Sequence, residues 1–112
     1  MQSDLSKAGS GPVGEPRSKP GRLPPGFTLF NHRYVSGDDG EYEHLVYSDG
    51  LAAVSVYVES LDGDRSHPEL TQKHGTTFAY TRAADGMMVT VVGNVPESTV
   101  EMIGKSVEAD PR

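Results

Sequence analysis

The sequence predicts a domain of the α+β class: an antiparallel sheet of about five strands with a C-terminal amphipathic helix packed on one face. Runs of alternating apolar and polar residues flank Asp49-Gly50 and Asp85-Gly86, and Asp-Gly pairs between such runs are typical of hairpins. Near Pro96 the apolar spacing changes to that of a helix. Consecutive hairpins followed by a single helix favour a sheet that is covered on one side.

The first 22 residues differ in composition from the rest of the chain. They are rich in glycine and proline, and their only large apolar residues are Met1, Leu5 and Val13. Such a composition cannot bury a core. We therefore expect a flexible linker over residues 1–22 and one folded domain over residues 23–112, beginning at the Leu-Pro-Pro-Gly sequence.

The first predicted hairpin follows a strand over about residues 27–34. Its own strands cover about residues 42–47 and 51–59, on either side of Asp49-Gly50. A two-residue turn there would place Tyr47 opposite Ala52, and opposed residues share a face. One face would then be apolar (Leu45, Tyr47, Val54, Val56, Val58), and the reverse face only half apolar (Tyr42, His44, Val46, Ser55, Tyr57).

Residues 60–75 are predicted to form a long loop with one helical turn near Pro68. A second hairpin is predicted from residues 76–82 and 87–92, with Tyr80 opposite Val91 and Arg82 opposite Val89. Its apolar side would consist of five residues: Phe78, Tyr80, Met87, Val89 and Val91.

A helix of about twelve residues is predicted from Pro96 onward. Val100, Ile103 and Val107 continue one apolar stripe, and Glu97 suits the positive end of the helix dipole. Because a helix of this length is marginal alone, it must dock on the sheet, and Gly104 beside the stripe permits a close approach.

Composition and motifs exclude several classes of function. The net charge of −6 disfavours nucleic-acid binding, and without cysteine there are no disulfides or thiolate metal sites. No catalytic or phosphate-binding motif occurs, so we expect no enzymatic activity and no cofactor. The four histidines (His32, His44, His67, His74) have no recognised metal-ligand spacing, so we expect no metal site.

The reverse face of the first hairpin is the candidate binding surface. It is neither properly polar nor apolar enough to form a core, and tyrosine is enriched at protein interfaces. We predict that Tyr42, His44, Ser55 and Tyr57 contact a partner. The alternative is that these residues merely cover the sheet.

Three stretches together resemble one known family: residues 23–27 (LPPGF), residues 46–51 (VYSDGL) with 54–56 (VSV), and residues 89–96 (VTVVGNVP) leading to Ile103. Their order and spacing resemble the C-terminal domain of the MucB/RseB family, over about residues 23–107. The resemblance implies a periplasmic regulator that binds the periplasmic domain of a membrane-bound anti-sigma factor and protects it from regulated proteolysis.

The resemblance also implies a second domain. In that family a lipid-carrier-like N-terminal domain precedes this one, so residues 1–22 would correspond to the interdomain linker. Two alternatives to direct anti-sigma binding stay open: a module that responds to lipid or lipopolysaccharide in a crevice between helix and sheet, and a scaffold that orients the N-terminal domain.

Overall fold

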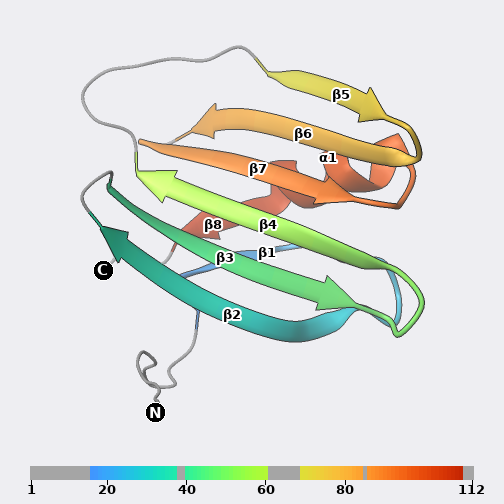
Figure 1. Cartoon of the computed structure of the whole chain (residues 1–112), viewed down its shortest axis with the longest axis horizontal. Helices are drawn as coiled ribbons and strands as arrows, with labels where there is room; N and C mark the ends of the chain where they lie inside the picture. Colours follow the sequence, from blue (N-terminus) through green and yellow to red (C-terminus); the bar gives the residue numbers. More distant parts are fainter. Residues whose placement is uncertain (1–15, 38–39, 61–68, 85, 110–112) are drawn as a thin grey trace.

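A computed structural model describes residues 16–37, 40–60, 69–84 and 86–109. It contains a six-stranded antiparallel sheet in the order β2-β3-β4-β7-β6-β5 (Figure 1). The strands are β2 (Thr28–Gly37), β3 (Gly40–Ser48), β4 (Ala53–Ser60), β5 (Leu70–His74), β6 (Thr77–Ala84) and β7 (Met87–Gly93).

One side of this sheet carries a second layer (Figure 1). It consists of helix α1 (Glu97–Ser106), which packs on β6 and β7, and a short ribbon in which β1 (Ser18–Pro20) pairs with β8 (Val107–Ala109). The predicted class and the helix on one face are confirmed.

The core lies between these two layers. Strands β3, β4, β6 and β7 contribute alternate residues, and α1 contributes the apolar stripe that includes Val100 and Ile103. Every member of the predicted apolar face of the first hairpin is buried. The buried apolar residues are Leu45, Tyr47, Val54, Val56, Val58, Tyr80, Val89, Val91, Val95, Val100, Ile103 and Val107.

The prediction of five strands was wrong, because β5 lies inside the stretch that was expected to be a loop. Leu70–His74 pairs with β6 at the sheet edge, where Leu70 lies opposite Thr81. All of its residues except Thr71 are exposed. Since neither face of β5 is buried, the strand has no apolar alternation that could reveal it in the sequence. Pro68 and the helical turn predicted there lie outside the described residues.

The first hairpin pairs two residues away from the predicted register. Tyr47 lies opposite Val54 rather than Ala52, because the connection is longer than a two-residue turn. The Asp49 carboxylate accepts hydrogen bonds from the backbone N–H groups of Leu51 and Ala52, both at 2.9 Å, and stabilises this loop. A shift of two residues leaves every side chain on its predicted face. In the second hairpin, Tyr80 does lie opposite Val91, as predicted.

Helix α1 ends one residue before Val107, which belongs to β8 instead of the helix. The helix lies so close to the sheet that a Cβ atom on Gly104 would overlap the Tyr80 ring. The expected close approach at this glycine is confirmed. At the same end of α1, the Arg82 guanidinium donates hydrogen bonds to the carbonyls of Gly104, Lys105 and Val107.

Residues 16–22 are organised differently from the linker that their composition predicts. Ser18 is buried, and Gly21 N–H donates to the Ser106 carbonyl at 2.8 Å. Glu43, which is 3% exposed, accepts hydrogen bonds at 2.7 Å from the Arg17 backbone N–H and from His32 Nε2. The structured part of the chain therefore begins before Leu23. Residues 1–15 of the predicted linker lie outside the described residues.

Candidate functional site

The side of the sheet opposite α1 is covered by no described element (Figure 1). We call this side the open face. On β3, β4 and β7 its positions alternate with core positions, and none of the open-face side chains on these three strands is buried. The open face includes Asn31, Arg33 and Val35 of β2, Tyr42, His44 and Val46 of β3, Ser55, Tyr57 and Glu59 of β4, Met88, Thr90 and Val92 of β7, Ala79, Thr81 and Ala83 of β6, and Leu70 and Gln72 of β5.

An aromatic cluster occupies the β3–β4 part of the open face. The rings of His44 and Tyr57 lie on directly opposed residues and stack, with centroids 4.4 Å apart and planes 3° apart. The ring of Tyr42 also lies beside that of Tyr57, with centroids 6.3 Å apart at an angle of 52°. Such contacts hold the rings in one arrangement and leave their outer surfaces accessible.

The ionisation of His44 is shifted by its surroundings. Burial, and then the positive charge of Arg33, lower the pKa of His44 below its ordinary value. Its Nε2 atom is buried and has no hydrogen-bond partner among the described residues. The open face therefore presents a neutral imidazole at neutral pH.

Ser55 lies beside the aromatic cluster rather than within it. Its backbone neighbours across the sheet are Val46 on β3 and Val92 on β7, which are both half-buried. The structure thus brings Tyr42, His44 and Tyr57 into one cluster and places Ser55 in an adjacent apolar row. This surface offers aromatic and aliphatic area with few charges, a composition that is typical of protein interfaces.

Arg33 was not among the predicted site residues. It lies on β2 opposite His44 and supplies a positive charge beside the aromatic cluster. A signal was present in the sequence, because Gly37 and Gly40 lie close together along the chain, and pairing them, as the structure does, places Arg33 opposite His44.

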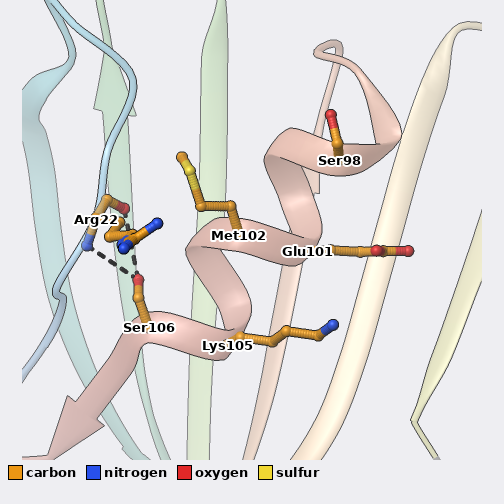
Figure 2. Close-up of a pocket in the computed structure, with 6 residues that line it drawn as sticks. All are labelled: Arg22, Ser98, Glu101, Met102, Lys105 and Ser106. Carbon is orange, nitrogen blue, oxygen red and sulfur yellow. Dashed lines mark hydrogen bonds between the residues drawn. The ribbon is translucent and has the colours of Figure 1, made fainter.

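A second candidate surface is an open groove of about 490 Å³ on the solvent side of α1 (Figure 2). Ser98, Glu101, Met102, Lys105 and Ser106 of the helix line it together with Arg22, whose backbone N–H donates to Ser106 Oγ at 3.1 Å. Met102 is the only apolar side chain of this lining, and Arg22, Glu101 and Lys105 add charged groups to it.

The described part of the chain contains neither a metal-binding cluster nor a membrane-spanning helix. There, no group of three or more histidine, cysteine, aspartate or glutamate residues could hold a metal ion. His67 lies outside that part. Likewise, no described helix is long and apolar enough to cross a membrane.

Comparison with known proteins gives consistent matches. The family model of the MucB/RseB C-terminal domain matches residues 15–108. The chain is 31% identical over 88 residues to the sigma-E factor regulatory protein RseB of Haemophilus influenzae, and 38% identical over 94 residues to the sigma factor AlgU regulatory protein MucB of Pseudomonas aeruginosa. Each alignment covers 79% of this chain. The chain spans 28% and 29% of the lengths of these two relatives.

Solved structures agree with these sequence matches. The complex of Pseudomonas aeruginosa MucA and MucB superimposes with a TM-score of 0.76 at 31% identity, covering 86% of this chain and 36% of that chain. MucB in complex with MucA(peri) gives the same TM-score at 30% identity, covering 88% of this chain and 38% of that one. The chain therefore belongs to the MucB/RseB C-terminal domain family.

Proposed function

We propose that this domain binds the periplasmic region of a membrane-bound anti-sigma factor through the open face, and so helps protect that region from regulated proteolysis. The observation that carries the proposal is the aromatic cluster on a sheet face that no described element covers. Solved relatives support the choice of partner, because MucB has been crystallised with MucA(peri). On this proposal the domain acts in the periplasm, as a binding module and not as an enzyme.

The composition of the open face suits a protein partner. Tyrosine side chains contribute large contact areas at a low cost in conformational entropy, and the stack on His44 fixes Tyr57 further. Val46 and Val92 extend the apolar area next to Ser55. Truncating such a central aromatic residue costs about 2 kcal/mol of binding free energy or more.

A calorimetric titration of this chain with the periplasmic region of the anti-sigma factor from the same organism tests the proposal. We expect Tyr57→Ala to weaken binding about 30-fold, as a loss of about 2 kcal/mol implies. Ser55→Arg should abolish binding, because it places a bulky charge within the open face. Ser98→Arg is the matched control, since Ser98 is exposed on α1 and lines the other candidate surface, the groove of Figure 2, and it should leave binding unchanged. Equal affinity for both arginine variants would contradict the proposal.

Protection is measured separately. The anti-sigma region is incubated with the protease that initiates its degradation, with and without this chain, and intact substrate is followed over time. We expect slower cleavage with the wild-type chain and no protection by Ser55→Arg. If the chain binds the anti-sigma region but does not slow its cleavage, the protective part of the proposal is wrong and only the binding part stands.

The two other functional alternatives are less well supported by these residues. The space between α1 and the sheet is filled by the core, and the groove of Figure 2 is open to solvent and lined by three charged residues, which does not favour an acyl-chain site. A scaffold role toward an N-terminal domain predicts association of the two separated domains, which calorimetry would detect. Such association without any binding of the anti-sigma region would favour the scaffold role.

A further inference from the structure

The two edges of the sheet differ in their suitability for pairing with another strand. Edge strands expose unpaired backbone groups, and proteins usually protect them by keeping them short or by placing lysine or proline in them. The β5 edge is five residues long and contains the exposed Lys73. The β2 edge is ten residues long, contains neither lysine nor proline, and has no strand beyond it in the described sheet (Figure 1).

The hydrogen bonds of β2 indicate which backbone groups face outward. The His32 N–H donates to Asn31 Oδ1 at 2.8 Å and is thereby directed away from the ladder with β3. Because antiparallel strands direct alternate residues toward each neighbour, the N–H groups of Tyr34 and Ser36 also face outward. The backbone N–H groups of Arg33 and Val35 then donate hydrogen bonds to β3.

The pairing of β3 with β4 supports this assignment independently. Hydrogen-bonded and non-hydrogen-bonded pairs alternate along an antiparallel ladder. The Asp49 N–H donates to the Ala52 carbonyl at 3.3 Å, so these two residues form a hydrogen-bonded pair. Five positions further along the register, His44 and Tyr57 form a non-hydrogen-bonded pair, so the backbone groups of His44 are directed to Arg33 on its other side. The register irregularity between Leu29 and Asn31 limits the regular outer edge to about residues 32–36.

Two exposed arginines flank this edge on opposite faces of the sheet. Arg33 lies on the open face, while the Arg17 guanidinium lies on the other side, 4.4 Å from the Tyr34 ring centroid and with Nη1 3.0 Å from the Tyr34 hydroxyl. The carboxylates of Glu41 and Glu43 lie on the Arg17 side, where they accept hydrogen bonds from Tyr34 and His32. An added strand with acidic side chains toward the open face would therefore meet the positive charge of Arg33.

We infer that an extended, acidic segment of the anti-sigma factor's periplasmic region adds to the outer edge of β2 over residues 32–36 as a seventh strand. This inference rests on the proposed function and specifies where and in what conformation the partner begins to bind. The added strand continues the row of Arg33, His44 and Tyr57, so the rest of the partner can reach the aromatic cluster. Main-chain hydrogen bonds supply affinity in such strand addition, and the flanking side chains supply specificity.

Residue-resolved amide hydrogen exchange tests the inference on the wild-type chain. The probe is the periplasmic region of the anti-sigma factor from the same organism, at saturation. We expect the amides of Tyr34 and Ser36 to exchange rapidly in the unbound chain. In the complex their exchange should be slower by a factor of about 10 or more. Those of Arg33 and Val35 should be protected in both states because they already bond to β3.

Charge reversal gives a second readout. Arg33→Glu should weaken binding about 5- to 10-fold, since it replaces an attractive cross-strand pair by a repulsive one. Lys73→Glu on the β5 edge makes the same change of charge on an exposed edge residue and should leave the affinity within about 2-fold of wild type.

The outcomes separate the two proposals. Binding with unchanged exchange at Tyr34 and Ser36 would overturn strand addition and leave the open-face proposal intact. Absence of binding would overturn both. Protection of these amides that depends on protein concentration without the probe would overturn the inference in favour of a second copy of this chain at the edge.

Discussion

Val91 and Val92 are neighbours on β7, yet they belong to two surfaces with different roles. Val91 is completely buried under α1, whereas Val92 is half-buried on the open face. The same contrast holds along β3 and β4, where buried and half-buried residues alternate. The core face carries the stability of the fold, and the open face retains apolar and aromatic area that the domain itself does not bury. Substitutions on the two faces should therefore affect different properties.

The largest difference is expected between these two valines. Val91→Ala should lower the free energy of unfolding by about 2–3 kcal/mol, because it removes buried methyl groups and leaves a cavity. Val92→Ala should cost less than about 1 kcal/mol, since its side chain is already partly exposed. Urea denaturation of both variants measures the difference, and equal losses would contradict the distinction between the faces.

Two glutamates extend the comparison to charged residues. Glu43→Ala should lower the free energy of unfolding by about 2 kcal/mol, because it removes a buried acceptor of two hydrogen bonds. The Arg17 N–H and His32 Nε2 then have no carboxylate to bond to. It should also speed amide exchange in β1. Glu59→Ala, on the exposed end of the open face, should change the unfolding free energy by no more than about 0.5 kcal/mol. An intact, slowly exchanging β1 in Glu43→Ala would show that this carboxylate does not hold the strand.

A smaller effect is expected where α1 approaches the sheet. Gly104→Ala gains about 1 kcal/mol of helix propensity, but its Cβ overlaps the Tyr80 ring, and overpacking costs about 1–3 kcal/mol. We expect a net destabilisation of about 1 kcal/mol in thermal or chemical unfolding. Ser98→Ala on the exposed side of α1 is the control and should be slightly stabilising. A stabilised Gly104→Ala would mean that α1 can move away from Tyr80 at little cost.

The smallest effect concerns the charge on the open face. Since the folded-state pKa of His44 is lowered, the unfolded chain takes up the proton first as the pH falls through about 6.5. The contribution of His44 to stability is thus complete above that pH and is lost as the pH falls toward its folded-state pKa. Arg33→Gln removes one cause of the shift and should raise the pKa of His44, as measured by NMR titration of its ring protons. A His44 pKa above 6.5 in the wild-type chain would contradict the proposed environment.

Local patterns predicted much of this fold. The second hairpin has the predicted register, and the faces of the first survive its shift by two residues, so the candidate site residues lie on the predicted side of the sheet. The shift itself depends on side-chain hydrogen bonds of Asp49, which lengthen the loop.

The strands that the sequence did not predict share a physical property, the lack of a local apolar pattern. Strand β5 is exposed on both faces, and β1 pairs with β8 from the opposite end of the chain, so neither has a local apolar pattern. Val107 satisfies the helical stripe but is buried in β8 instead, because both positions lie over the same core. The partner residues on the open face stay a prediction, since alternation identifies a face and does not identify what binds it.

The most direct test of the central claim is methyl NMR of this chain during titration with the periplasmic region of the anti-sigma factor. Val46 and Val92 report on the open face, and Val54 and Val91 report on the core from neighbouring positions. We predict that the methyl signals of Val46 and Val92 shift or broaden at concentrations that leave those of Val54 and Val91 nearly unchanged. Shifts confined to the α1 groove around Met102, with Val46 and Val92 unaffected, would contradict the assignment of binding to the open face.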